Sequence, residues 1–232
     1  MTASPDRAAP STVRFDAVLF DLDGVLVDSE MLANRVWLDL LAQHGLTFTS
    51  QEFLERSVGS SFKVLYEGLK RDFGWERPAD FDARSDAALA AAFEGVLPIE
   101  GAPETLQALA RAGVPYAVAS NSRRDRLELK VRAAGLEALL PHRLDPALVG
   151  GHGKPAPDLY QAAARQLGVA AARCLVIEDS LTGVQAGVAA GATVWGLLAG
   201  GHTHGGTGAQ LQAAGASRLL YSHAELRGAL GL

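Results

Sequence analysis

Two pairs of acidic residues follow apolar runs in the sequence. Asp21 and Asp23 come directly after one such run, and Glu178 and Asp179 close another. Short apolar runs bounded by turn signals are typical of buried strands in a parallel sheet, and ligands bind at the carboxyl ends of such strands. Acids are also common at ordinary strand-to-loop turns, but two pairs at two strand ends would repel one another, and a divalent cation would relieve that repulsion. Because hard oxygen ligands favour Mg²⁺, the sequence predicts a magnesium site.

A serine motif and a lysine lie between the two acidic pairs in the chain. Ser120-Asn121-Ser122 follows an apolar run and precedes a helical stretch, so its hydroxyls and backbone amides could hold an anion at a helix N-terminus. Lys154 lies in a proline-containing loop ahead of another helical stretch, where it could neutralise both a phosphate and a carboxylate. Taken alone, the serine would be a helix cap and the lysine a solvated charge. Their order along the chain, each at a strand end or a helix start, indicates a phosphate site.

The elements that would position these residues alternate between strand and helix in the C-terminal part of the chain. Apolar runs predict strands at residues 13–20, 114–120, 174–179 and 192–198, with weaker ones at 218–222 and 147–149. The stretches between them have helical periodicity and end at glycines, and Pro103 opens one of them. This alternation predicts a doubly wound α/β fold.

Residues 28–97 break that alternation. Leu32 and Val36 recur at helical spacing, and Thr49 with Glu52 forms a capping box for a following helix. Nothing in the segment predicts a strand. About seventy residues of helix after one strand are too many for a single crossover connection. We therefore expect an inserted helical subdomain.

The composition excludes several classes of protein. The chain has 232 residues, of which 48% are hydrophobic and 20% charged, as in a globular protein with room for a sizeable core. Its net charge of −5 leaves no basic surplus for a nucleic-acid backbone, and no run approaches the roughly 20 apolar residues of a membrane span. The first residues carry no apolar signal-peptide core, and the single cysteine, Cys174, cannot form an internal disulfide. We expect a cytoplasmic protein without nucleic-acid or membrane partners, in which Cys174 is a small core residue.

Four motifs, in order, resemble those of the haloacid dehalogenase-like (HAD) superfamily. They are FDLDGVLVDSE at residues 20–30, SNS at 120–122, GKPAPD at 153–158 and IEDS at 177–180. The resemblance runs from residue 13 to about residue 198. It implies a Rossmann-like α/β core with a mostly parallel sheet, at residues 1–27 and 97–232, and an all-helical cap at residues 28–96.

The resemblance also implies catalytic roles for the motif residues. Asp21 would be the nucleophile that forms an aspartyl-phosphate, and Asp23 would be the general acid for the leaving alcohol and then the base for water. The residues that would hold the transferring phosphoryl group are Ser120, Asn121 and Lys154. Since true dehalogenases lack the second acid, the presence of Asp23 favours phosphoryl chemistry.

A set of magnesium ligands follows from the same resemblance. Asp21 and Asp179 would bind Mg²⁺, with Glu178 as a further ligand or as a neighbour of one. The carbonyl of Asp23 would complete the set. A carboxylate attacks an anionic phosphoryl group only when the cation and Lys154 screen the repulsion between them.

Within the superfamily, the motifs look like those of the subgroup that contains β-phosphoglucomutase and small sugar-phosphate phosphatases. Ser60 stands where the mutase has a cap arginine, and Ala33 stands where a histidine would help it. These departures favour a phosphatase of small phosphate monoesters, such as sugar phosphates, over a phosphomutase. A non-catalytic phosphate-accepting or binding domain is a second alternative, disfavoured because Asp21, Asp23 and Lys154 are all present. The family-like default is a monomer acting on a small phosphorylated metabolite.

Four further residues are candidates for contacts with the substrate. Ser60, Ser61 and Lys63 are cap positions that could set specificity. Arg123, directly after the serine motif, could meet a second anionic group because its guanidinium suits anions.

A glycine-rich stretch at residues 200–208 carries two histidines, His202 and His204. A metal site there would need further ligands that the sequence does not show. We interpret the stretch as a flexible surface loop.

Overall fold

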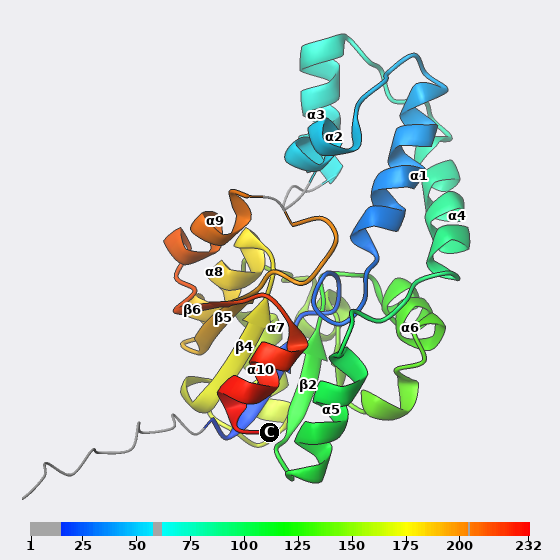
Figure 1. Ribbon diagram of the computed structural model, residues 1–232. Coiled ribbons are helices and arrows are strands. Elements are labelled where there is room, and N and C mark those ends of the chain that lie inside the picture. Colours follow the sequence, from blue (N-terminus) through cyan, green and yellow to red (C-terminus); the bar gives the residue numbers. More distant parts are fainter. Residues whose placement is uncertain (1–14, 58–61, 204) are drawn as a thin grey trace, which may run out of the picture.

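A six-stranded parallel sheet forms the centre of the protein (Figure 1). The computed structural model describes residues 15–57, 62–203 and 205–232, and of Phe62 and Lys63 it describes the backbone only. The strand order is β3-β2-β1-β4-β5-β6, and all neighbouring strands are parallel. The strands are β1 (Ala17–Phe20), β2 (Tyr116–Ala119), β3 (Arg143–Leu144), β4 (Cys174–Glu178), β5 (Thr193–Leu197) and β6 (Arg218–Leu220). The predicted doubly wound α/β fold is confirmed.

The order of the strands reverses direction at β1. The chain runs from β1 outward to β2 and β3 on one side, and then crosses to β4, β5 and β6 on the other. Ligands in open α/β sheets bind where the order reverses, beyond the carboxyl ends of the strands. Asp21 directly follows β1, Ser120 directly follows β2, and Glu178 ends β4. The predicted site residues therefore stand at the crevice that this topology creates.

Helices cover both faces of the sheet. Val18 and Phe20 of β1 pack with α5, α6 and α10, whereas Ala17 and Leu19 pack with α7, α8 and α9. Both sets are buried, which explains why the strand reads as an unbroken apolar run. The helices are α5 (Ala102–Arg111), α6 (Arg124–Ala133), α7 (Asp158–Gln166), α8 (Leu181–Ala189), α9 (Thr207–Ala213) and α10 (His223–Leu230).

The edge strand beside β2 differs from the prediction. The strand predicted at residues 147–149 is wrong, because that segment lies in a 3-10 helix, Pro146–Val149, and the edge strand is β3. Pro146 has no N–H to give to a strand ladder. The Asp145 carboxylate accepts a hydrogen bond from the Ala147 N–H at 2.8 Å, which caps the helical turn instead.

Helices α1 (Glu30–Ala42), α2 (Ser50–Ser57), α3 (Phe62–Phe73) and α4 (Phe81–Phe93) stand together at one end of the sheet (Figure 1). They share a hydrophobic cluster that includes Trp37 and Phe53, separate from the two clusters of the sheet. The predicted capping box is confirmed: the Glu52 N–H donates to Thr49 Oγ1 at 3.2 Å, and the Thr49 N–H donates to Glu52 Oε2 at 2.7 Å. In the described ranges this part of the chain holds helices and no strand, as the sequence predicted.

The chain enters and leaves this helical part side by side. Val27 and Pro98 form an isolated antiparallel bridge, and the Asp28 N–H donates to Leu97 O at 2.9 Å. These residues lie next to the predicted boundaries of the cap, and the division into two domains at residues 28 and 96 stays a prediction. Across the described ranges, every helix is too short or too polar to cross a membrane.

Candidate active site

A cavity of about 600 Å³ lies between the carboxyl edge of the sheet and helices α1 to α4. The helices contribute apolar side chains to it, among them Trp37, Phe53 and Leu89. The predicted site residues that line it are Asp21, Asp23, Ser120, Asn121, Arg123, Lys154 and Asp179. Glu178 is fully buried beside them. The fold therefore brings all four sequence motifs to one place.

Strand pairing places Asp21 beside Glu178. Phe20 of β1 and Ile177 of β4 are register partners, and the Asp21 N–H donates to Ile177 O at 3.0 Å. Asp21 follows Phe20 and Glu178 follows Ile177, so the two acids come at the same level of the sheet. The position of the acids is thus a direct consequence of how β1 pairs with β4.

Asp23 does not continue the strand but belongs to the turn that follows it. The turn is closed by a hydrogen bond from the Gly24 N–H to Val27 O at 2.8 Å. Gly24 has a φ of +75°, and a Cβ at this position would lie 1.7 Å from Asp179 Oδ2. Only glycine allows both this backbone conformation and the close approach of Asp179.

Three buried carboxylates form a donor set for a cation. Asp21, Glu178 and Asp179 each offer an oxygen, and these oxygens all lie within 4.8 Å of one another. Burial raises the pKa of Asp21 well above its ordinary range, and the neighbouring carboxylates raise it further against the lowering effect of Lys154. Burial also raises the pKa of Asp179. A divalent cation would relieve this repulsion, and an all-oxygen donor set suits Mg²⁺, so the residues present fit a metal ion.

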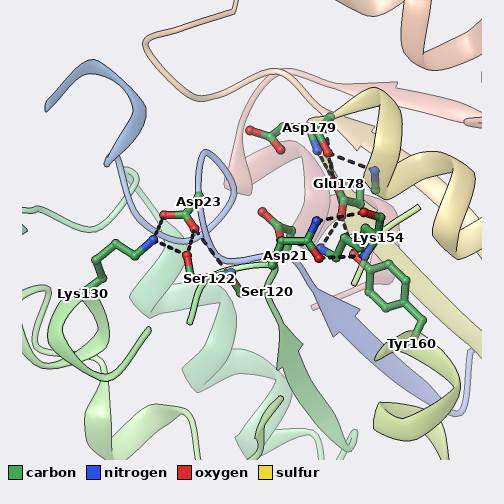
Figure 2. A network of polar contacts seen from close by, with 12 residues as sticks. Asp21, Asp23, Ser120, Ser122, Lys130, Lys154, Tyr160, Glu178 and Asp179 are labelled. Atoms are coloured by element: carbon green, nitrogen blue, oxygen red, sulfur yellow. Dashed lines mark hydrogen bonds and ion pairs between the residues drawn. The ribbon is translucent and has the colours of Figure 1, made fainter. Parts of the chain in front are cut away.

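Lys154 bridges two of the acids. Its ammonium donates to Asp21 Oδ1 and, at 2.6 Å, to Glu178 Oε1 (Figure 2). Burial lowers the pKa of Lys154, but the two carboxylates outweigh that effect and hold the pKa above its ordinary value. Nζ also lies 4.8 Å from the centre of the Tyr160 ring, whose hydroxyl donates to Glu178 Oε1 at 2.5 Å. A fixed positive charge therefore stands in contact with Asp21.

The N-terminus of α8 fixes Glu178. Oε2 of Glu178 accepts hydrogen bonds from the Ser180 N–H at 3.3 Å and from the Ser180 hydroxyl at 3.0 Å. Ser180 in turn caps the helix by accepting from the Gly183 N–H at 3.1 Å. A Cβ on Gly183 would lie 1.9 Å from the carboxylate carbon of Glu178. Glycine at this position leaves the space that the carboxylate needs.

Asp23 has a buried lysine of its own. Lys130 of α6 donates to Asp23 Oδ1, and the Ser122 hydroxyl donates to Oδ2 at 3.1 Å (Figure 2). The Ser29 hydroxyl also donates to Oδ1. Burial alone would raise the pKa of Asp23, but Lys130 and the hydroxyls outweigh it and the pKa is lowered. Asp23 is therefore held as a carboxylate. Sequence reasoning missed Lys130, whose signal was a lysine three residues after Leu127 on the buried face of a helix.

Ser120 and Asn121 extend from the end of β2 into the site. Ser120 Oγ lies 3.4 Å from Asp23 Oδ2 and accepts from the Ser122 N–H at 3.0 Å. Asn121 Nδ2 donates to Lys154 O at 3.0 Å, and Asn121 Oδ1 accepts from the Lys154 N–H at 2.7 Å. The Asn121 side chain thus holds the main chain of Lys154 in place, and its predicted phosphate contact stays a prediction.

Of the predicted specificity residues, Arg123 is the one whose side chain is described. Ser60 and Ser61 lie outside the described residues, and the side chain of Lys63 is likewise not described. The Arg123 guanidinium binds Asp86 of α4 at 3.0 Å and Asp125 at 2.9 Å. It lines the cavity with both carboxylates already bound to it.

His202 corrects the interpretation of the glycine-rich stretch. Its side chain is buried and lines the cavity, and its Nε2 lies 3.1 Å from Asp179 Oδ2. The prediction of a flexible surface loop is therefore wrong at this residue, because the chain after β5 folds back against Gly24 and the acidic cluster. His204 lies outside the described residues.

The protein has an α/β fold with a buried acidic cluster where the strand order reverses at β1. Comparison with known proteins identifies its family. The model of the haloacid dehalogenase-like hydrolases matches residues 15–191. The chain belongs to this family, as its four motifs predicted. A solved structure of a HAD family hydrolase from Deinococcus radiodurans R1, with bound phosphate and sodium, is 52% identical to this chain. The match has a TM-score of 0.85 and covers 94% of this chain and 96% of that one.

Curated relatives include phosphatases and mutases. Hexitol phosphatase A of Escherichia coli is 34% identical over 78% of this chain and 82% of its own length. A beta-phosphoglucomutase of Mycobacterium bovis is 30% identical over 77% of this chain and 78% of its own length. The chloroplastic protein SUPPRESSOR OF QUENCHING 1 of Arabidopsis thaliana is 34% identical over 76% of this chain, which matches only 17% of the length of that relative.

Proposed function

We propose that the protein is a magnesium-dependent phosphatase that hydrolyses small phosphate monoesters through an aspartyl-phosphate on Asp21. The observation that carries the proposal is the contact of Lys154 with Asp21, beside the acidic cluster at the switch point of the sheet. A carboxylate flanked by a buried ammonium and two further acids has the charge arrangement that attack on an anionic phosphoryl group requires. Membership of the hydrolase family supports the same reaction.

In the first step, an oxygen of Asp21 attacks phosphorus and the bond from phosphorus to the leaving oxygen breaks. Asp21, Glu178 and Asp179 would hold Mg²⁺, which when bound stabilises the charge that develops on the phosphoryl oxygens. Asp23 gives a proton to the leaving alcohol. Since Lys130 holds Asp23 as a carboxylate in the free protein, that proton enters with the substrate, because a phosphate ester has a second pKa of about 6.

In the second step, a water molecule attacks the phosphorus of the aspartyl-phosphate. Asp23 takes a proton from the water, inorganic phosphate leaves, and the Asp21 carboxylate is regenerated. Asp23 passes this proton to the departing phosphate, which leaves as H₂PO₄⁻, so Asp23 is again the carboxylate of the free protein and the catalytic cycle closes. Ser120 and Lys154 would hold the phosphoryl group through both steps, since both line the cavity beside Asp21.

The substrate we propose is a small phosphorylated metabolite, with sugar phosphates first. A cavity of about 600 Å³ holds a molecule of that size. The similarity to a hexitol phosphatase, and to a hydrolase solved with bound phosphate, supports this class. The monomeric state and the cytoplasmic location expected from the sequence remain part of the proposal.

A phosphomutase is the second candidate, favoured by the similarity to a beta-phosphoglucomutase. Such an enzyme must return the phosphoryl group to a sugar rather than to water. Ala33, at the position where a histidine would help the mutase, lines the cavity from α1 and offers no polar group. We therefore place hydrolysis ahead of transfer.

The test is phosphate release from a panel of sugar phosphates and from p-nitrophenyl phosphate, with Mg²⁺ and with EDTA. The expected result is release that needs Mg²⁺ and falls to background in Asp21→Asn. Asp16→Asn is the matched control, because Asp16 is exposed and pairs with Arg173 away from the cavity. Phosphate release that survives in Asp21→Asn would contradict the role of Asp21 as the nucleophile. Silence on all compounds, followed by conversion of β-glucose 1-phosphate with a bisphosphate activator, would favour the mutase, and silence there as well would favour a binding role.

A further inference from the structure

The loop after β5 inserts one histidine into the acidic site. His202 is 5% exposed, although it lies in a glycine-rich segment between β5 and α9. Its Nε2 forms an ion pair with Asp179 Oδ2 at 3.1 Å, and both side chains are 4% exposed. Because a carboxylate can only accept, the proton of this contact is on Nε2 of the ring.

The space for the imidazole is built by two glycines. A Cβ on Gly24 would lie 2.6 Å from His202 Cε1, and a Cβ on Gly200 would lie 2.8 Å from the same atom. Any larger residue at either position would displace the ring. The turn after β1 and the loop after β5 are therefore shaped to hold the imidazole against Asp179.

The surroundings of His202 are acidic on more than one side. Asp179 follows β4, Asp28 lies two residues before α1, and Glu30 is the first residue of α1. Hydrogen bonding to Asp179 and the charges of these acids outweigh burial and raise the pKa of His202 to about 8. Nε2–H can donate to Asp179 from the neutral as well as from the protonated ring, so the contact itself does not depend on the pKa.

We propose that His202 is a positioning residue for the metal site, whose Nε2–H holds the Asp179 carboxylate beside Asp21 and Glu178. This inference rests on the proposed function, because it concerns the cation that the function requires. Without the donor, repulsion from Asp21 and Glu178 would turn the Asp179 carboxylate away, and a cation would have to reorder it on binding. Hydrogen-bond partners of metal ligands change metal affinity by about 10- to 100-fold when they are removed.

The experiment is calorimetric titration of the EDTA-treated full-length protein with Mg²⁺ alone, which measures binding without any turnover. His202→Gln places an amide N–H near the position of Nε2 and keeps the donor to Asp179. His202→Asn places its amide near Nδ1 and loses that donor. We expect His202→Asn to bind Mg²⁺ at least about 10-fold more weakly, and His202→Gln to stay within about 3-fold of the wild type.

Two controls separate this effect from general damage. His142→Asn removes a histidine whose only side-chain bond in the described ranges is to exposed Gln166, outside the cavity, and should leave Mg²⁺ binding unchanged. Thermal melting of each variant in EDTA identifies any that do not fold. If His202→Asn does not fold, His202→Gln carries the test, since weak binding by that folded variant would contradict the proposed role.

The Mg²⁺ titrations separate the role of His202 from the magnesium dependence of the proposed phosphatase. Mg²⁺ binding by the wild type with equal binding by folded His202→Asn overturns the role of His202 and leaves the phosphatase proposal intact. No Mg²⁺ binding by the wild type overturns the magnesium dependence itself, and the inference fails with it. A loss in His202→Asn that His202→Gln restores supports the inference.

Discussion

Lys130 and Asp23 are 107 residues apart in the chain, and the ammonium of the lysine donates directly to Oδ1 of the acid. The side chain of Lys130 is 4% exposed and that of Asp23 is 19% exposed, so the ion pair is largely withdrawn from solvent. It matches the pair formed by Lys154 and Asp21 on the other side of the site (Figure 2). Asp21 and Asp23 therefore each have their own lysine, one from α6 and one from the loop before α7.

We expect Lys130→Met to impair the protonation of the leaving group more than the attack on phosphorus, because the Asp23 carboxylate loses one of the donors that orient it. The kcat for an alkyl phosphate such as a hexitol phosphate should fall by about 100-fold, the range of general acid–base catalysis. The kcat for p-nitrophenyl phosphate should change much less, because nitrophenolate leaves without a proton. The measurement is the ratio of the two kcat values in the wild type and the variant.

Lys70→Met is the control for this experiment, because Lys70 lies on the exposed side of α3 and pairs with Glu76. It should leave the ratio unchanged. Equal losses on both substrates in Lys130→Met would mean that Lys130 only supports the structure of the site and does not govern Asp23.

The positions of the acidic residues and of Ser120 at the ends of strands could be predicted from the local sequence. Asp21 and Ser120 follow apolar strands directly, and the pairing of parallel strands at one edge is enough to bring them together. Lys130 offered only its position on the buried face of a helix, and His202 offered no local signal; their roles arise when α6 and the loop after β5 fold against the first motif. The two-residue strand β3 was missed for a similar reason, because it is too short to show a period.

Gly24 and Gly45 offer a matched pair of substitutions. Both have nearly the same positive φ, +75° and +76°, so alanine at either position strains the backbone by about 1 kcal/mol. A Cβ at position 45 meets nothing within 4 Å, whereas one at position 24 meets Asp179 and His202. We expect Gly45→Ala to lower stability by about 1 kcal/mol with unchanged kcat/KM, and Gly24→Ala to lose stability and most activity. Similar kcat/KM values for the two variants would show that the approach of Asp179 to Gly24 is not needed for the reaction.

Removal of Mg²⁺ should destabilise the protein in a way that depends on Asp179. A ligand that binds only the folded state adds about 2.7 kcal/mol at 100 times its Kd. We therefore expect the Tm to rise with Mg²⁺ concentration in the wild type and to stay flat in Asp179→Asn. A Tm that rises equally in both proteins would place the bound cation elsewhere.

His223 provides a test of stability against pH beneath the turn at residues 23–27, which carries Asp23. The ring is fully buried, and its Nε2 donates to Val25 O at 2.8 Å, within the segment that follows Asp23. Burial lowers the pKa of His223, and the nearby Arg227 lowers it further. The unfolded chain therefore binds a proton on this histidine at a pH where the folded protein does not.

This difference makes the folded protein less stable as the pH falls. The contribution of neutral His223 is complete above the ordinary histidine pKa of about 6.5, and it is lost as the pH falls from there towards the lower pKa of the folded state. We expect the free energy of unfolding, measured by urea titration at pH 7.5, 6.5 and 5.5, to fall less steeply in His223→Gln than in the wild type. His142→Gln, which changes a histidine bonded to exposed Gln166, should keep the wild-type slope. If His223→Gln also keeps that slope, the acid sensitivity of the fold comes from other groups, and the contact of His223 with the turn at residues 23–27 does not depend on its protonation.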